Sequence, residues 1–260
     1  MGMPAAEFAV IGGTGVYDPA LLEDGEEHAL ATPYGVAQCT IGSYRGRAVA
    51  FMARHGKGHG VPPHQVNYRA NIAALHSLGV RRAFATAAVG SLRLSLPPGS
   101  LVIVDQFLDF TKGRPSTFFE GGEPVRHIDM TDPYCRGLRG QLAETARRLG
   151  IAAANGGTYV CTEGPRFETP AEIRMFAQLG GDVVGMTSVP EAALARELGI
   201  CYAAVAMVTN LCAGMSGAPL SHQEVLDEMG RNVHLLRRLF FETLAVAGAE
   251  RRCGCAGEER

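Results

Sequence analysis

The chain has 260 residues, of which 47% are hydrophobic and 19% are charged, and its formal net charge is −2 at pH 7. A chain of this size can bury one large core, so we expect a single α/β domain over residues 1–250. The small net charge offers no basic surface for nucleic acid, and no apolar run reaches the roughly 18 residues that a membrane span requires. Nucleic-acid-binding and membrane-spanning classes are therefore excluded.

The first predicted element is an apolar strand in FAVIGGTG, residues 8–15, which runs into a glycine-rich turn. Bare glycine backbone can approach an anion closely, so this turn is a candidate phosphate loop, with an ordinary tight turn as the alternative. A dinucleotide fingerprint would need G-x-G-x-x-G at the start of a helix and an acid about 20 residues further on. The sequence VYDP follows instead, which argues against a nicotinamide-dependent oxidoreductase.

Two basic side chains end the next apolar strand, AVAFMARHG, which follows a predicted hairpin at residues 39–46 with its turn at 43–46. Arg54 and His55 suit a phosphate dianion, because a guanidinium group binds two oxygens at once and an imidazole adds a directed donor. A solvated strand end is the alternative interpretation.

A helix is predicted over residues 67–78, stopped by Gly79, and the strand RRAFATAAV follows it. That strand runs into Gly-Ser, so the backbone amides of Ala87 and Ala88 are candidates for an anion-binding nest.

The middle of the chain contains an alternating strand at residues 101–107, a long loop and an amphipathic helix at 138–149 that ends at Gly150. The loop contains Phe118, Phe119 and His127. Exposed phenylalanines would be a liability on a monomer surface, so we expect an oligomer to cover them.

Residues 157–191 form the stretch around which the chain is organised, a predicted strand, helix and strand with polar groups at the strand ends. In open α/β sheets the crossover is right-handed and ligands collect beyond the carboxyl ends of the strands. Residues 163–168 and 186–188 should therefore face one crevice, where we place the active site. For Glu168 the alternative is an acid in the first turn of the helix, stabilised by the helix dipole.

The last predicted strand, AAVAMVTN, ends at Asn210, and SHQEV then begins a helix with Ser221 as its N-cap. His222 either faces the crevice or is exposed at the helix start.

The seven cysteines are scattered and odd in number, as in reduced cytoplasmic proteins, and the start of the chain lacks a signal-peptide pattern. Cys253 and Cys255 form a C-x-C in residues 251–260. Because the sequence offers no adjacent ligand pair, we expect a disordered tail there and no metal.

Several motifs occur together in a recognisable order: IGGTG at 11–15, ARHG at 53–56, VNYRANI at 66–72, TAAVGSL at 86–92, EGPRFET at 163–169, VVGMTSVPE at 183–191 and VTN at 208–210. With these motifs the sequence resembles the trimeric purine nucleoside phosphorylase and methylthioadenosine phosphorylase family, from residue 11 to about residue 225. The resemblance implies a central mixed sheet flanked by helices. It also implies reversible phosphorolysis of a purine nucleoside by inorganic phosphate as co-substrate, with no metal or organic cofactor, in a homotrimer or a hexamer made of two trimers.

The resemblance also implies site roles. The phosphate-binding set is Thr14, Arg54, His55, Ala87, Ala88 and Thr187. The substrate-binding set is Phe167, Met186, Cys212 and His222, with Phe119 and His127 completing a neighbouring subunit's ribose pocket. Related methylthioadenosine enzymes carry threonine in place of Ala87, so any contact from this position must come from its backbone.

Asn210 and Glu168 are the predicted catalytic pair, acting on the purine. Family members with asparagine at the position of Asn210 act on 6-oxopurines, because an amide can donate toward O6 and accept from protonated N7. Glu168 can accept from N1–H, and His222 would contact the ribose 5′-hydroxyl. The predicted function is a 6-oxopurine nucleoside phosphorylase. A methylthioinosine or methylthioadenosine phosphorylase is the first alternative, because LCAGMSGAP at 211–219 departs from either family pattern and weakens the assignment at the ribose 5′ position. A non-catalytic nucleoside-binding protein is the second, although it would not need Arg54, His55 and Thr187 together.

Overall fold

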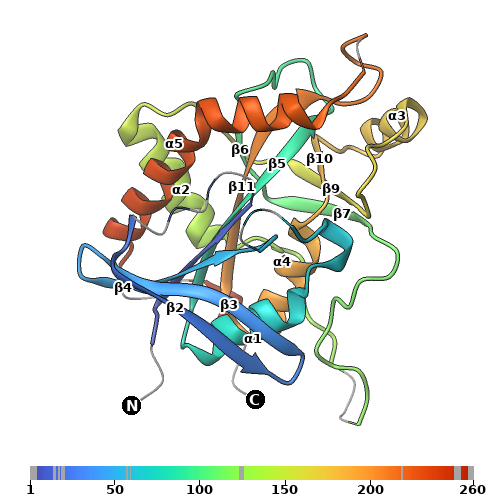
Figure 1. Ribbon diagram of the computed structural model, residues 1–260. Coiled ribbons are helices and arrows are strands. Elements are labelled where there is room, and N and C mark those ends of the chain that lie inside the picture. Colours follow the sequence, from blue (N-terminus) through green and yellow to red (C-terminus); the bar gives the residue numbers. More distant parts are fainter. Residues whose placement is uncertain are drawn as a thin grey trace.

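The computed structural model describes residues 5–13, 16, 18, 21–56, 58, 60–122, 126–217, 219–248 and 253–256. Within them, one 11-stranded mixed sheet is covered by helices (Figure 1). The predicted α/β fold with a central mixed sheet is confirmed. None of the helices in this part of the chain combines the length and apolar character that crossing a bilayer demands.

The strands are β1 (Phe8–Gly12), β2 (Glu23–Thr32), β3 (Gly35–Tyr44), β4 (Arg47–Ala53), β5 (Arg82–Ser91), β6 (Leu101–Ile103), β7 (Gln106–Phe110), β8 (Ala153–Asn155), β9 (Thr158–Thr162), β10 (Val183–Gly185) and β11 (Cys201–Leu211). The α-helices are α1 (Tyr68–Ser77), α2 (Arg136–Leu149), α3 (Pro170–Gln178), α4 (Ser188–Glu197) and α5 (His222–Val246).

Strand β5 pairs with three other strands, two of which share one of its edges. β11 pairs with it in parallel along its whole length, from Arg82 to Ser91. A strand has two edges, so β1 and β10 must share the other one. β1 pairs in parallel with β5 as far as Ala85, and β10 pairs antiparallel with it from Gly90 onward. Among the strands that the structure describes, residues 86–89 therefore have no partner on that edge.

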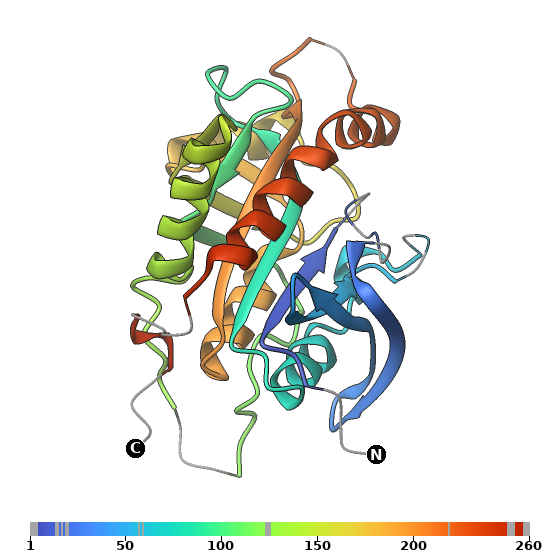
Figure 2. The same cartoon turned by 90° about the vertical axis from the view of Figure 1, so that its left-hand side faces the viewer.

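Four of the α-helices lie in two layers, one on each face of the sheet. α2 and α5 pack together over one face (Figure 2), and α1 and α4 pack over the other. Two separate clusters of buried apolar side chains fill these interfaces, with Phe84 and Phe240 stacked at 5.6 Å between ring centroids in one of them. The central strands are thus buried on both sides, which accounts for the long apolar runs in β5 and β11.

Helix α5 is buried unevenly along its length. Its N-terminal half buries only Val225 and Met229, whereas its C-terminal half buries Leu236, Leu239, Phe240, Phe241, Thr243 and Leu244. The guanidinium of Arg47 donates to the carbonyls of Leu244 and Ala247, both at 2.6 Å, and so satisfies the end of the helix. At the other end, Ser221 and Glu224 form a capping box, as the N-cap prediction for Ser221 requires.

Most predicted elements are confirmed, including the hairpin, whose turn residues Arg45 and Gly46 have positive φ. Two differ from the expectation. The strand predicted at residues 101–107 is divided into β6 and β7, which pair with different neighbours. β2 has the charged sequence EDGEEHALAT, which gave no strand signal. Ala87 and Ala88 lie inside β5, as the predicted strand at 81–89 places them.

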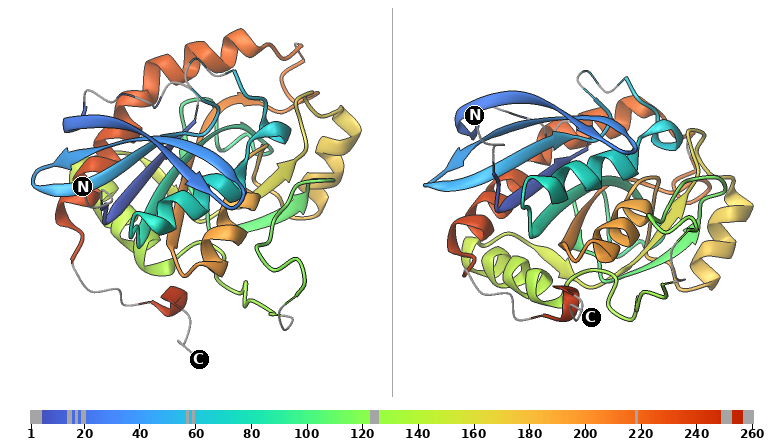
Figure 3. Two further views of the ribbon diagram at one scale, coloured as in Figure 1. Left: turned by 60° about the horizontal axis from the view of Figure 1, so that its bottom comes forward. Right: turned by 90° about the horizontal axis from the view of Figure 1, so that it is seen from below.

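The tail also differs from the expected disorder at the residues that the structure describes. Gly254–Ala256 form a 3₁₀ turn (Figure 3). Cys255 within it is buried. This packing is not predictable from local sequence, because the contacting residues come from distant parts of the chain.

Candidate active site

A cavity of about 390 Å³ lies where β5 lacks a partner on one edge. Its lining includes eleven of the predicted site residues: Arg54, His55, Ala87, Ala88, Phe167, Glu168, Met186, Thr187, Asn210, Cys212 and His222. They come from the ends of β4, β9, β10 and β11, from β5 and from the start of α5. The strand ends therefore converge as the fold prediction requires. Thr14 lies outside the described residues, although Gly13 beside it lines the cavity.

Arg54 is held in place by contacts within the protein. Its Nε and Nη2 donate to the two carboxylate oxygens of Glu191 in α4, and its Nη1 donates to the carbonyl of Thr86 at 2.8 Å. Both side chains of the ion pair are only 1% exposed. Three of the five guanidinium N–H groups are thus committed, and the rest can serve a ligand.

The charge on Arg54 is secure in this setting. Burial opposes the charged form, but the charge of Glu191 and its hydrogen bonds outweigh burial and raise the pKa of Arg54. Tyr202 in β11 donates a further hydrogen bond to Glu191 at 2.7 Å. Glu191 was not predicted, because an acid in the first turn of a helix is usually a solvated residue that favours the dipole.

Gly13 brings the loop after β1 directly against this guanidinium. A Cβ at Gly13 would lie 3.2 Å from Nη1 of Arg54, so a larger residue would push the two apart. The Gly13 amide donates to the hydroxyl of Thr86 at 3.0 Å, which ties the loop to the open edge of β5. Because Thr86 presents its carbonyl to Arg54, strand alternation directs the amide of Ala88, two residues on, toward the same edge.

Two further predicted phosphate ligands lie beside this edge. His55 is buried, and its Nδ1 lies 2.8 Å from the carbonyl of Val61, which fixes the ring orientation. Thr187 is the N-cap residue of α4, and its amide donates to the Tyr159 hydroxyl at 3.2 Å. A helix N-terminus favours an anion, so this end of the cavity combines a guanidinium, a backbone edge and a helix dipole.

Asn210 and Glu168 lie in the same cavity. The Asn210 amide oxygen accepts from the Thr209 hydroxyl at 2.9 Å, and its Nδ2 donates to the carbonyl of Leu211 at 3.0 Å. The Nδ2 group therefore keeps one hydrogen for a ligand, and the amide oxygen keeps one lone pair. A β-bulge between Val208 and Asn210 marks the local irregularity in β11 that accompanies this position.

Glu168 precedes the N-cap of α3, Thr169, so the alternative of a first-turn acid is wrong. Burial raises the pKa of Glu168, although a hydrogen bond from the Thr162 hydroxyl at 2.6 Å favours the charged form. The side chain is thus a partly desolvated carboxylate with one oxygen fixed by Thr162. This environment strengthens any hydrogen bond that it accepts from a ligand.

Arg114 is a site-forming residue that the sequence analysis missed. Its buried guanidinium donates to the carbonyl of Met186, after β10, and to the carbonyls of Thr162 and Glu163, at the end of β9. It thus ties together the two segments that were expected to face one crevice. Arg114 comes from the long loop after β7, where periodicity gives no indication of burial.

Met186 has little room to move away from the cavity. A Cβ at Gly164, which has φ of +66°, would lie 2.5 Å from the sulfur of Met186. Only glycine fits this position, because both the backbone conformation and the packing exclude a side chain. Phe167, at 37% exposure, lines the cavity nearby.

The other two predicted site residues, Phe119 and His127, are not among the residues that line the cavity of their own chain. Phe118 and Phe119 are half-buried rather than exposed. The ring of Phe118 lies 5.1 Å from that of Tyr34, and the Arg126 guanidinium lies 5.0 Å from the Phe119 ring. His127 is exposed.

Comparison with known proteins identifies the family. The model of the phosphorylase superfamily matches residues 7–245. The chain belongs to the phosphorylase superfamily. Among its superfamily relatives, a "Probable 6-oxopurine nucleoside phosphorylase" of Dictyoglomus turgidum is 58% identical, covering 95% of this chain and 94% of the relative. The "6-oxopurine nucleoside phosphorylase" of Pyrococcus furiosus is 53% identical, covering 95% and 96%.

The phosphorylase fold is also found in solved structures. The crystal structure of a methylthioadenosine phosphorylase from an antarctic soil metagenomic library superposes on this phosphorylase with a TM-score of 0.90 at 38% identity. The match covers 97% of this chain and 90% of that one. The predicted family resemblance is therefore confirmed.

Proposed function

We propose that this phosphorylase cleaves 6-oxopurine nucleosides, of the inosine and guanosine type, with inorganic phosphate to give the free base and ribose 1-phosphate. One observation carries the proposal. A single cavity holds an amide and a carboxyl that complement a 6-oxopurine, Asn210 and Glu168, together with the anion-binding groups of Arg54, His55 and Thr187.

The phosphate end supplies the nucleophile. Phosphate held by the remaining donors of Arg54, by His55, by the Ala88 amide and by Thr187 attacks C1′ of the ribose as the glycosidic bond breaks. Charge on the sugar develops toward an oxocarbenium ion, and the bonding electrons pass to the purine. The phosphate oxygen forms the new bond directly, so the reaction needs no covalent enzyme intermediate and no organic cofactor.

The base end stabilises the leaving group. Asn210 donates to O6 and accepts from protonated N7, while Glu168 accepts from N1–H. The hydrogen bond that Asn210 donates to O6 strengthens as negative charge develops on the purine, so it binds the transition state more tightly than the substrate. Adenine has no N1–H to offer Glu168, which explains the preference that we propose. The names of the relatives at 53% identity and above support the same substrate class.

A methylthioinosine phosphorylase is the second candidate. His222 lines the cavity and suits a ribose 5′-hydroxyl, which favours ordinary nucleosides. The apolar side chains of Leu220 and Val225 also line it, however, and would suit a methylthio group. The substrate at the 5′ position therefore has to be measured.

The test is phosphate-dependent release of free base from inosine, guanosine, 5′-methylthioinosine and 5′-methylthioadenosine, each with and without phosphate. We expect turnover of inosine and guanosine that requires phosphate and yields ribose 1-phosphate. Base release without phosphate would indicate a hydrolase. A higher kcat/KM for methylthioadenosine than for inosine would overturn the 6-oxopurine assignment.

We also propose a homotrimer, or a hexamer of two trimers, in which Phe119 and His127 reach a neighbour's ribose pocket. The location of both residues away from the cavity of their own chain supports this arrangement. Sedimentation at assay concentration should give a multiple of three chains of 27.5 kDa, and a monomer mass would contradict it. The cytoplasmic location remains a proposal that rests on the predicted free thiols.

A further inference from the structure

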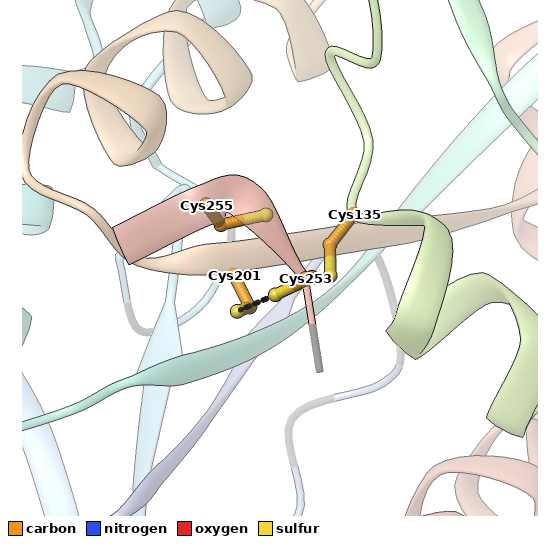
Figure 4. Close-up of side chains that lie close together, drawn as sticks. All are labelled: Cys135, Cys201, Cys253 and Cys255. Atoms are coloured by element: carbon orange, nitrogen blue, oxygen red, sulfur yellow. Dashed lines mark hydrogen bonds between the residues drawn. The ribbon is translucent and has the colours of Figure 1, made fainter. Parts of the chain in front are cut away.

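Four of the seven cysteines come together at one place, remote from the cavity. Cys135, Cys201, Cys253 and Cys255 place their sulfur atoms all within 4.8 Å of one another (Figure 4). The sulfurs of Cys201 and Cys253 are 3.3 Å apart. We propose that these four cysteines form a structural tetrathiolate site for a tetrahedral divalent metal, with zinc as its natural occupant.

The fold brings the four residues together from three separate segments. Cys201 begins β11, and Cys135 is the N-cap residue of α2. The Cys135 amide donates to the carbonyl of Tyr202, the neighbour of Cys201, at 2.7 Å, which fixes these two cysteines side by side. The C-terminal 3₁₀ turn then brings Cys253 and Cys255 over them (Figure 4).

The first turn of α2 leaves room for the tail. A Cβ at Gly137 would lie 3.8 Å from the Cβ of Cys253 and 3.8 Å from the sulfur of Cys135. Cys253 of the tail therefore packs directly against Gly137 in the first turn of α2. Three of the four cysteines are buried and Cys253 is half-buried, so solvent has little access to the sulfurs.

The sulfur separations, of 3.3 Å for one pair and at most 4.8 Å for all, suit four ligands around one metal ion. Zinc–sulfur bonds of about 2.3 Å in a tetrahedron place the ligand sulfurs about 3.8 Å apart. All four sulfurs satisfy a common separation of this order, as a shared central ion requires. Four sulfur ligands in a tetrahedron select zinc or iron over harder cations.

The chemistry of the site is balanced by proton release. A divalent ion that binds four thiols displaces four protons to solvent and leaves a complex of charge −2. The N-terminus of α2, where Cys135 is located, favours this negative charge. No oxidant or reductant takes part.

The site would have a structural role, holding residues 253–256 against β11 and α2, rather than a catalytic one. Cys201 and Asn210 lie at opposite ends of β11, roughly 30 Å apart at 3.3 Å per residue. The metal would join the start of β11, the start of α2 and the C-terminal tail. Unlike the phosphate and base contacts, it therefore does not depend on the proposed function.

The direct test uses the full chain, purified under reducing conditions with zinc in the growth medium. Elemental analysis should give one zinc per chain. Replacement of zinc by cobalt(II) should produce the visible ligand-field bands and sulfur-to-cobalt charge-transfer absorption of a tetrahedral CoS₄ centre. The double variant Cys253→Ser/Cys255→Ser should lose the bound metal and these bands. The matched control Cys39→Ala, which removes another buried thiol, should keep both.

A strong chelator should lower the melting temperature of the wild type and of Cys39→Ala, but leave that of the double variant unchanged. Turnover at moderate temperature should be the same in all three proteins. Absence of zinc and of cobalt bands in wild type with reduced thiols would overturn the proposal. So would mass spectrometry that finds the four cysteines joined as disulfides after purification without reductant. If the double variant fails to fold, the wild-type cobalt spectrum still decides the matter.

Discussion

The substitution Asn210→Asp tests the base-recognition hypothesis most directly. Asn210 is only 9% exposed, and its amide already donates to the Leu211 carbonyl and accepts from the Thr209 hydroxyl. Its second N–H is the donor that we assign to O6 of the purine. A carboxylate at this position keeps the hydrogen bond from Thr209 but has no hydrogen to donate, so it faces O6 with like-signed charge.

The magnitude follows from these contacts. Loss of a hydrogen bond to a charged leaving group costs about 1.5–3 kcal/mol. Repulsion between a buried carboxylate and the developing charge adds to this, and we expect about 3–4 kcal/mol in total. That corresponds to a loss of roughly two to three powers of ten in kcat/KM for inosine. Turnover of 6-aminopurine nucleosides should improve relative to inosine, because an aspartate can accept from the 6-amino group.

The assay is the ratio of kcat/KM for inosine to that for adenosine and for methylthioadenosine, at saturating phosphate. Asn155→Asp provides a matched control, because Asn155 is exposed at the end of β8 and takes no part in the cavity. The control should retain the wild-type ratio. If the wild type prefers 6-amino substrates, or if Asn210→Asp leaves the ratio unchanged, base selection lies elsewhere and the reasoning is wrong.

Three further outcomes are expected. Burial raises the pKa of Glu168, so kcat/KM for inosine should fall on the acid side at a higher pH than an ordinary glutamate would cause. Glu168→Gln should abolish that limb, and an unchanged pH profile would remove Glu168 from its role. Arg54→Ala should raise the KM for phosphate and lower the free energy of unfolding by about 3–5 kcal/mol, because Glu191 is left buried without its counter-charge. An unchanged phosphate KM, or a urea-unfolding loss below about 1 kcal/mol, would contradict this assignment. Arg114→Met should lower kcat/KM by one to two powers of ten, because about 1–3 kcal/mol is lost when buried carbonyls lose their donor. Equal kcat/KM in Arg114→Met and in wild type would show that the segments after β9 and β10 are positioned without it.

Residues at the ends of apolar strands were the most predictable part of the site. Arg54, Glu168, Thr187 and Asn210 each follow or end such a strand, and neighbouring strands of a sheet bring their ends to one edge. Their convergence on one cavity therefore depended only on recognising the strands. The start of α5 was equally accessible, because the cap residue Ser221 is a local signal.

Long-range pairing was the part that the sequence could not supply. Glu191 has the local pattern of a solvated first-turn acid, and only the fold shows that it neutralises Arg54. Arg114 lies in a loop without periodicity, yet its guanidinium is buried among carbonyls from two other segments. The sulfur of Cys253 lies 3.3 Å from that of Cys201, 52 residues away in the sequence. No spacing rule relates such residues, because tertiary packing alone creates their contact.

The uneven burial of α5 has a consequence for how a nucleoside enters and leaves. The 25 residues of α5 form a rod about 37 Å long, at 1.5 Å per residue. One half is fixed in the core and tied to Arg47, while the other carries His222 to the mouth of the cavity. A rod fixed in this way can tilt about its buried half, so a small rotation there becomes a large displacement at the cavity. We therefore expect amide hydrogens at 226–233 to exchange faster than those at 236–244, and bound nucleoside to slow only the first group.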